Sequence, residues 1–250
     1  MRLDGKVAII TGAGAGIGRG IAQAFAAEGA ALVLAGRTVA PLEECRREVV
    51  ALGSQALVAR CDVGDPDDLD RLVEVTLAGY GRLDILVNNA AFVPHGSLLE
   101  IDDADVDLAL RTGPLAALRL MRLCHPHLRN GGSIINISSG ASIAAATSER
   151  GAYAAAKAAL NAISRTAANE WGPDGIRVNS IMPFARSTAL EGFLAGEPEY
   201  AATLAASVPL RRIGDPRLDI GAAAVFLASS EASYITGITL PVDGGLAYVR

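Results

Sequence analysis

The sequence predicts a single α/β domain in which a doubly wound parallel sheet is flanked by helices. Short β-branched or Leu-rich runs alternate with Ala-rich helical stretches along the 250 residues, a pattern typical of parallel sheets with right-handed crossovers. Hydrophobic residues make up 51% of the chain and aromatic residues only 4%, so small aliphatic side chains must fill a core on both faces of the sheet. No Pro-, Gly- or Ser-rich linker divides the chain.

The elements follow from the spacing of apolar residues. Strands are expected at 6–10, 31–35, 55–59, 85–87, 133–137, 176–181 and 239–242. Helices are expected at 17–28, 41–52, 66–80, 104–128 and 153–171. The stretch 184–216 breaks the alternation and is rich in Ala, Pro and Gly. We expect it to be an insertion that covers the carboxyl ends of the strands, where such folds bind ligands.

Composition excludes several classes of protein. The net charge of -5 argues against binding to nucleic-acid backbones or to an anionic membrane surface. Cys45, Cys61 and Cys124 form no Cys-x-x-Cys pair, which favours neither a disulfide framework nor a metal site. The first residues are too polar for a secretory signal, and no apolar run reaches the roughly 18 residues of a membrane span. We therefore expect a soluble, cytoplasmic protein without bound metal.

A glycine-rich loop follows the first strand directly and leads into the first helix. Helix N-termini offer unpaired N–H groups and a positive dipole end to a pyrophosphate, and glycines let the backbone approach it. This position predicts a Rossmann-type dinucleotide site, although a tight turn alone would also explain the glycines. The residues expected to contact the cofactor here are Gly12, Gly14, Ala15, Gly16, Ile17 and Gly18.

The end of the second strand indicates which nucleotide binds. NAD sites usually present an acidic residue there to the ribose hydroxyls, whereas NADP sites use arginine. This chain has Arg37 and no acid in Ala-Gly-Arg-Thr at 35–38, so NADP is favoured over NAD, with a solvated surface charge as the other interpretation. Asp62 and Val63 follow the third strand, and the Asp62 carboxylate could accept a hydrogen bond from the adenine amino group.

Tyr153 and Lys157 lie four residues apart on an expected helix and therefore share one face. A phenol must lose about three units from a pKa near 10 to act as acid and base at neutral pH. An ammonium group at close range supplies stabilisation of that order, so Lys157 is expected to lower the pKa of Tyr153. Ser139 follows a buried strand upstream and is expected to hold the substrate oxygen.

Taken in order along nearly the whole chain, these residues resemble the short-chain dehydrogenase/reductase family. The matching positions are 11–18, Asp62, Asn88-Asn89-Ala90, Ser139, Tyr153, Lys157, 176–179, Pro183, Thr188 and 242–245. The resemblance implies reversible hydride transfer between NAD(P) and an alcohol or carbonyl carbon, with Tyr153 as general acid/base and Lys157 also a ribose ligand. It implies that Asn89, Ala90, Pro183 and Thr188 border the cofactor. It also implies a homotetramer packed through the helices at 104–128 and 153–171.

Three departures from the family pattern concern the site. The family usually has an asparagine in the helix after the fourth strand, as part of a proton relay; here counting places that position at Gly113, or at Leu110 in a second alignment. The usual Asn-Asn-Ala-Gly ends in Ala91, and the usual Pro-Gly is Pro183-Phe184. The first departure leaves the route of proton delivery to Tyr153 open.

The leading hypothesis is an NAD(P)-dependent oxidoreductase that interconverts a secondary alcohol with a ketone or aldehyde. We expect an apolar substrate, because Phe92, Ile143, Phe184, Leu190 and Phe193 could line its pocket, but Arg150 or Arg186 could instead recognise a carboxylate or phosphate. Two other hypotheses stay open. One is a non-catalytic NAD(P)-binding regulator, and the other is a lyase or dehalogenase built on the same fold.

Overall fold

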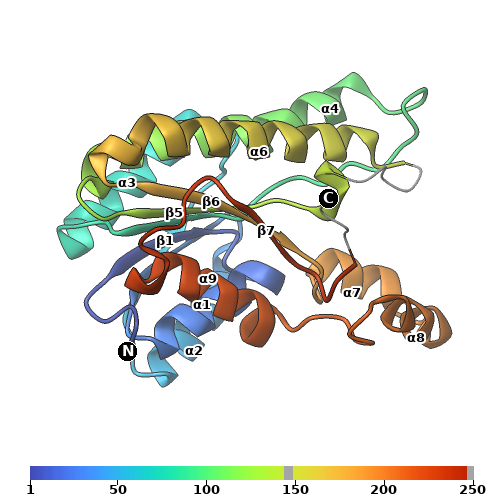
Figure 1. The fold of residues 1–250 in the computed structure, drawn as a ribbon, viewed down its shortest axis with the longest axis horizontal. Coiled ribbons are helices and arrows are strands. Elements are labelled where there is room, and N and C mark those ends of the chain that lie inside the picture. Colours follow the sequence, from blue (N-terminus) through green and yellow to red (C-terminus); the bar gives the residue numbers. More distant parts are fainter. Residues whose placement is uncertain (144–148, 247–250) are drawn as a thin grey trace.

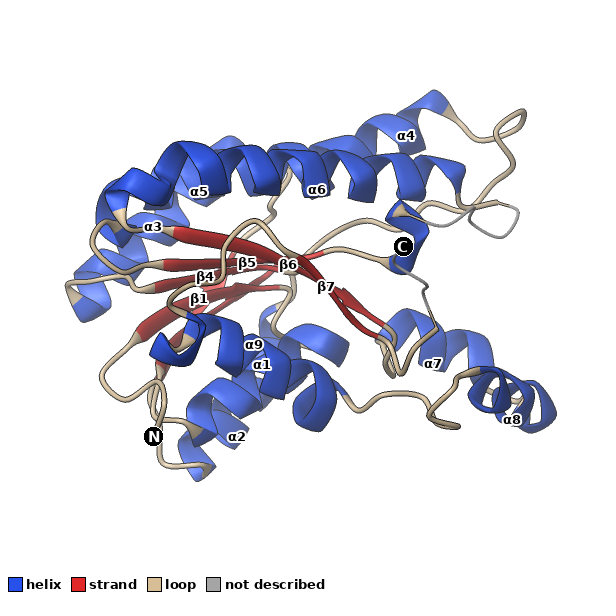
Figure 2. Ribbon diagram, in the orientation of Figure 1, coloured by secondary structure: helices blue, strands red, loops and turns tan. Residues whose placement is uncertain are grey.

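The fold is a seven-stranded, fully parallel sheet with helices on both faces (Figure 2). A computed structural model describes residues 1–143 and 149–246, apart from the side chains of Ala189 and Phe193. The strand order is β3-β2-β1-β4-β5-β6-β7. The strands are β1 (Val7–Thr11), β2 (Ala31–Gly36), β3 (Ala56–Arg60), β4 (Ile85–Asn88), β5 (Ser133–Ile137), β6 (Arg177–Pro183) and β7 (Thr239–Val242). The predicted doubly wound single domain is confirmed.

Two helical layers cover the sheet (Figure 1). One contains α1 (Gly16–Ala27), α2 (Val39–Ala51) and α9 (Ala222–Ala228). The other contains α3 (Pro66–Tyr80), α4 (Asp103–Leu110), α5 (Ala116–Leu128) and α6 (Gly151–Trp171). Along β1, Ala8 and Ile10 belong to the hydrophobic core on one face, whereas Ile9 belongs to the core on the other. Burial on both faces explains why the strands are continuously apolar rather than alternating.

The helix expected at 104–128 contains an irregular turn. α4 and α5 are joined by a π-helical turn, Arg111–Leu115, that includes Pro114. Proline has no backbone N–H to donate to the preceding turn and its ring crowds the carbonyl there, so the helix widens locally instead of continuing as a regular α-helix. The buried Gly113 lies inside this turn, close to the site described below.

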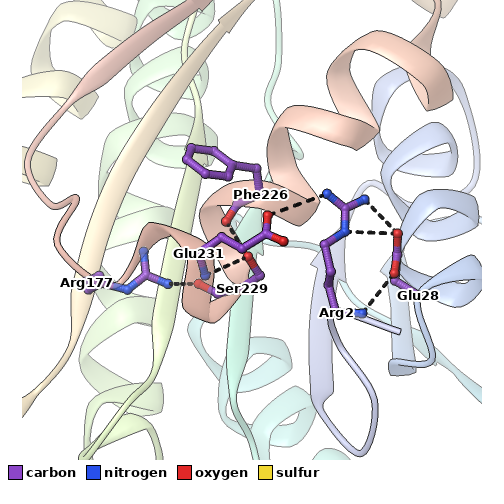
Figure 3. Close-up of polar contacts among 6 residues, drawn as sticks. All are labelled: Arg2, Glu28, Arg177, Phe226, Ser229 and Glu231. Atoms are coloured by element: carbon purple, nitrogen blue, oxygen red, sulfur yellow. Dashed lines mark hydrogen bonds and ion pairs between the residues drawn. The ribbon is translucent and has the colours of Figure 1, made fainter.

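Helix α9 was not expected from the sequence, because its seven residues are too short for a clear helical period. Just beyond its end, Arg177 Nη2 donates to Ser229 O at 3.2 Å, and Glu231 N donates to Ser229 Oγ at 3.2 Å. Arg2 contacts Glu28 at 2.6 Å and Glu231 at 3.9 Å. Figure 3 shows how these contacts tie the segment after α9 to the start of the chain and to β6. Within α9 itself, Ala224, Val225, Leu227 and Ala228 are buried in the core on this face of the sheet, and this packing fixes the element.

The segment 184–216 contains two short helices, α7 (Thr188–Leu194) and α8 (Pro198–Ser207). They lie beyond the carboxyl ends of β6 and β7 (Figure 1). Its two ends are held together, because Arg186 N donates to Gly214 O at 3.0 Å and Gly214 N donates to Phe184 O at 3.2 Å. The segment is thus a strap closed at its base, and its role as a substrate cover stays a prediction. None of the helices in the described ranges is long and apolar enough to cross a membrane.

Candidate active site

The expected site residues gather at the carboxyl edge of the sheet, where β1, β4 and β5 are neighbours. Thr11 ends β1, Asn88 ends β4, and Ser139 follows β5 by two residues. In parallel strands these ends lie on one side of the molecule, where folds of this type bind ligands. Segments that are far apart in the sequence therefore form one site.

The glycine loop forms a cradle in which side chains would not fit. A Cβ at Gly12 would lie 2.7 Å from Asn89 Nδ2, and one at Gly18 would lie 2.2 Å from Gly12 O. Helix α1 begins at Gly16, Ala15 provides no side-chain cap, and its first turn holds no acid. The N–H groups of that turn are therefore left for an external acceptor. The loop and helix fit a pyrophosphate group.

Asn89 and Thr11 fix the position of this loop. Asn89 Nδ2 donates to Thr11 O at 2.9 Å and to Gly12 O at 3.2 Å. Thr11 Oγ1 in turn accepts from the backbone N–H groups of Asn89 and Ala90, at 2.9 and 3.0 Å. Asn89 was expected to border the cofactor; its amide is used, in addition, to hold the glycine loop against β4.

The other expected cofactor residues lie around the same edge. Thr188 belongs to the strap, and its N and Oγ1 are 3.1 and 3.2 Å from where a Cβ of Gly16 would be. Asp62 Oδ1 accepts from Gly64 N at 2.9 Å, which orients the carboxylate after β3. Arg37 is exposed directly after β2. Val63 is buried, and Pro183 is half-buried at the end of β6.

Lys157 is a buried cation on α6. Its side chain is only 4% exposed, and Nζ donates to Ile137 O at 2.7 Å. Nζ also lies 5.7 Å from the centroid of the Tyr153 ring. Burial lowers the pKa of Lys157 to about 8, because the charged form loses hydration in the protein interior. At neutral pH the lysine still carries its proton.

The Tyr153 phenol differs from its sequence-based expectation. Burial raises the pKa of Tyr153 above its ordinary value, whereas a hydrogen bond with Ser139 and the charge of Arg150 act to lower it. Lys157 was expected to be the group that lowers this pKa, but its Nζ is directed to a carbonyl of β5. The chain's own contacts thus keep the phenol protonated, and desolvation is the dominant cause.

Beside Lys157 lies a cavity of about 10 Å³, close to the space that one water molecule requires. Its polar lining comes from Thr11, Asn88, Thr112 and Lys157, and Gly113 lies among the lining residues. Of the two positions considered for the family's asparagine, Gly113 lines this cavity and Leu110 does not. A Cβ at Gly113 would meet only Ala156 Cβ, at 3.9 Å. The missing side chain leaves open space next to the lysine.

Two polar residues near Ser139 were missed by the sequence reasoning. Ser142 lies in the 3₁₀ turn that begins just after Ser139, and Asn161 lies one helical turn beyond Lys157 on α6. Asn161 is 3% exposed. A polar residue four positions after Lys157, on the same helix face, was a signal that could have identified it.

The expected pocket residues differ in their exposure. Phe92, Phe184 and Leu190 are half-buried, and Ile143 is 48% exposed. Phe193 lies outside the described side chains. Among the residues that the structure describes, no group of three His, Cys, Asp or Glu side chains could hold a metal ion.

Comparison with known proteins assigns the family. A family model described as enoyl-(acyl carrier protein) reductase matches residues 12–247. A 12alpha-hydroxysteroid dehydrogenase of Clostridium sp. is 42% identical over 252 residues, covering 97% of this chain and 97% of that protein. The 7alpha-hydroxysteroid dehydrogenase of Escherichia coli K12 is 36% identical over 247 residues, covering 98% and 95%. The chain belongs to the short-chain dehydrogenase/reductase family.

A solved structure gives the same result for the fold. A 7 alpha-hydroxysteroid dehydrogenase complexed with NADH and 7-oxo glycochenodeoxycholic acid superposes with a TM-score of 0.92 at 36% identity, covering 100% of this chain and 97% of that one. The resemblance inferred from the sequence is therefore confirmed, and the protein's relatives are oxidoreductases.

Proposed function

We propose that this protein is an NAD(P)(H)-dependent oxidoreductase that interconverts a secondary alcohol of a hydroxysteroid and the corresponding ketone. The observation that carries this proposal is the juxtaposition of Tyr153 with Ser139, its hydrogen-bond partner, and with Lys157 at the carboxyl edge of the sheet. The substrate class comes from relatives that are hydroxysteroid dehydrogenases.

The cofactor would lie along the carboxyl edge of the sheet. Its pyrophosphate fits the first turn of α1 and the glycine loop, with Asp62 and Val63 on the adenine side. Ala90, Asn89, Pro183 and Thr188 would border the nicotinamide half. Exposed Arg37, with no acid beside it in Ala-Gly-Arg-Thr at 35–38, favours NADP over NAD. When bound, the nicotinamide supplies the hydride acceptor for oxidation and the hydride donor for reduction.

The chain's own residues handle the proton. In the reductive direction the Tyr153 phenol transfers its proton to the carbonyl oxygen, and in the oxidative direction the phenolate takes it back from the alcohol. Ser139 donates a hydrogen bond to the substrate oxygen, where negative charge develops in the transition state. The Lys157 ammonium, held by its bond to Ile137 O, would bind the ribose hydroxyls. A proton would be transferred from Lys157 through the cavity beside Gly113.

The residues at the entrance of the site suit a large apolar substrate that carries an anionic group. Leu98 is 76% exposed and Leu99 is 99% exposed, and a Cβ on Gly151, at the start of α6, would touch Leu98. Exposed apolar side chains in such a group are typical of ligand-binding surfaces. Of the two arginines considered for a carboxylate, Arg186 is paired with Glu191 at 3.3 Å. Arg150 has no ion pair with the described residues, and its charge acts to lower the pKa of Tyr153. We therefore propose that Arg150 binds the carboxylate of the substrate.

Absorbance at 340 nm tests the proposal directly. NADPH and NADH are offered with oxosteroids that carry a carboxylate, with their methyl esters, and with small ketones. We expect turnover of the steroids and none for Tyr153→Phe, which should still bind NADPH because the phenol oxygen is not part of the glycine loop. Binding of NADPH without turnover of any ketone would favour the regulator, and a cofactor-independent reaction would favour a lyase. Near-normal turnover by Tyr153→Phe would contradict the role of the phenol.

We also propose a cytoplasmic homotetramer that packs through α4, α5 and α6. Leu115 lies at the junction of α4 and α5 and is 44% exposed despite its size, as expected for a side chain that a second subunit covers. Light scattering of the purified protein measures the assembly. A Leu115→Glu variant that leaves the mass unchanged would contradict this interface.

A further inference from the structure

A partly buried hydrogen-bond chain connects α6 to the turn that carries Ser139. Asn161 Nδ2 donates to Ser142 Oγ at 2.8 Å, and Ser142 Oγ donates to Ser139 O at 2.6 Å. Ser142 is half-buried, and Asn161 is 3% exposed. The chain therefore runs from the helix of Tyr153 and Lys157 to the backbone of the residue expected to hold the substrate oxygen.

The direction of these bonds follows from counting protons. A serine hydroxyl has one proton to donate, and a backbone carbonyl can only accept. The Ser142 hydroxyl therefore donates to Ser139 O, since its other possible acceptor, Met182 Sδ, is farther away at 3.7 Å. Ser142 Oγ then accepts hydrogen bonds, and its shorter donor is Asn161 Nδ2 at 2.8 Å, against 3.4 Å for Ser138 Oγ.

This arrangement leaves one buried polar atom of Asn161 without a hydrogen bond to the described residues. Among the buried side-chain nitrogen and oxygen atoms of the described residues, Asn161 Oδ1 is without a hydrogen-bond partner. Leaving a buried acceptor unsatisfied costs about 1–3 kcal/mol. An apolar side chain of similar size would avoid that cost, so a benefit elsewhere must explain the asparagine.

The benefit lies in the turn at Gly140–Ser142. None of its three residues is buried, so apolar packing contributes little to holding it. Ser139 Oγ accepts from Ala141 N at 3.2 Å, which orients the side chain within the turn but does not anchor the turn to the protein. The contacts of Ser142 with Ser139 O and Asn161 supply that anchor.

We propose that Asn161, acting through Ser142, is a positioning residue that holds the Ser139 hydroxyl in place against Tyr153. The inference rests on the proposed function for the role of Ser139, and neither Asn161 nor Ser142 contacts the reacting atoms. Displacing a reacting or hydrogen-bonding group by about 1 Å can cost a factor of about 100 in rate. Loss of this support should therefore appear in turnover rather than in binding.

The Asn161→Leu variant separates this role from ordinary packing. Leucine is close in volume and removes the unsatisfied oxygen, so the urea midpoint should be unchanged or higher. We expect kcat for the best ketone to fall about tenfold or more, with KM and the NADPH dissociation constant within about twofold of wild type. A normal kcat in this variant would overturn the proposal, and so would a fall in kcat that is matched by a lowered urea midpoint.

Ser164→Ala is the matched control. Ser164 lies on the same helix, is 2% exposed, and accepts from Asn136 Nδ2 at 2.8 Å, but none of its hydrogen bonds with the described residues involves Ser139 or Ser142. Its replacement should lower the urea midpoint and leave kcat unchanged. Ser142→Ala should lower kcat as Asn161→Leu does, and combining the two should add no further loss, because both act through one chain. Losses that multiply in the double variant would refute a shared path.

Amide hydrogen exchange separates failure of this inference from failure of the proposed function. Exchange at residues 139–142 should accelerate severalfold in Asn161→Leu and stay unchanged in Ser164→Ala, whatever the enzyme's substrate. If wild-type protein reduces no ketone while exchange behaves as expected, the proposed function fails and the anchoring role stands. Unchanged exchange in Asn161→Leu would overturn the anchoring role itself.

Discussion

Lys157 should make the stability of this protein depend on pH in a characteristic way. Its ordinary pKa of 10.5 and its pKa of about 8 in the folded chain differ by about 2.5 pH units, which corresponds to about 3 kcal/mol. Below pH 8 the lysine is charged in both states, and folding must desolvate the ammonium. Between pH 8 and 10.5 the folded state loses this proton first, so the unfolded state binds more protons and stability rises with pH.

Comparison with Lys157→Met isolates this contribution. Methionine has a similar length and no charge, so titrations elsewhere in the protein cancel in the difference. Urea unfolding of both proteins at one concentration, at pH 7, 8, 9 and 10, gives the two free energies of unfolding. We expect Lys157→Met to be the more stable near pH 7, and its advantage over wild type to shrink by up to about 3 kcal/mol toward pH 10.5. A difference that stays flat across this range would refute the burial argument.

Three further substitutions test the site. Gly18→Ala should weaken NADPH binding at least tenfold and lower the free energy of unfolding by about 1–3 kcal/mol, because the new Cβ would lie 2.2 Å from Gly12 O. Fluorescence titration measures the binding. In the control Gly172→Ala the new Cβ would meet no atom within 4 Å, so neither quantity should change. Arg37→Asp should shift the kcat/KM ratio toward NADH, and an unchanged ratio would contradict the nucleotide proposal. Gly113→Asn should not reduce kcat, since the position has room for a Cβ; a large loss would mean that substrate or helix packing uses that space.

The order of elements and the parallel sheet could be predicted because each strand is a short apolar run followed by a helical period. The boundaries of α3 illustrate why: Asp65 caps the helix by accepting from Asp67 N, and Gly81 ends it at a φ of 70°. Helix α9 could not be predicted in the same way. Its buried residues belong to the same core cluster as Ile21 and Phe25 of α1, near the other end of the chain, and such contacts carry no local signal.

The glycine loop and the pair Tyr153 and Lys157 on α6 were predictable because their residues lie at fixed short spacings. The distances between separate segments were not. Local spacing places Lys157 on the same helix face as Tyr153, but only the fold shows that Lys157 Nζ donates a hydrogen bond to Ile137 O. Likewise, nothing local links Ser142 to Asn161, which are 19 positions apart. Sequence identifies which groups are present, and the tertiary structure decides which partner each one takes.

Burial shifts the pKa values of Tyr153 and Lys157 in opposite directions. It raises the pKa of the Tyr153 phenol and lowers that of the Lys157 ammonium, so both shifts favour the uncharged forms. A protonated phenol can donate to a carbonyl oxygen, whereas alcohol oxidation needs the phenolate. We therefore expect kcat/KM for ketone reduction to hold through neutral pH and to fall as the phenol ionises, and the optimum for alcohol oxidation to lie at higher pH. Rate profiles in both directions measure this, and coinciding optima near pH 7 would show that another group sets the protonation state of the tyrosine.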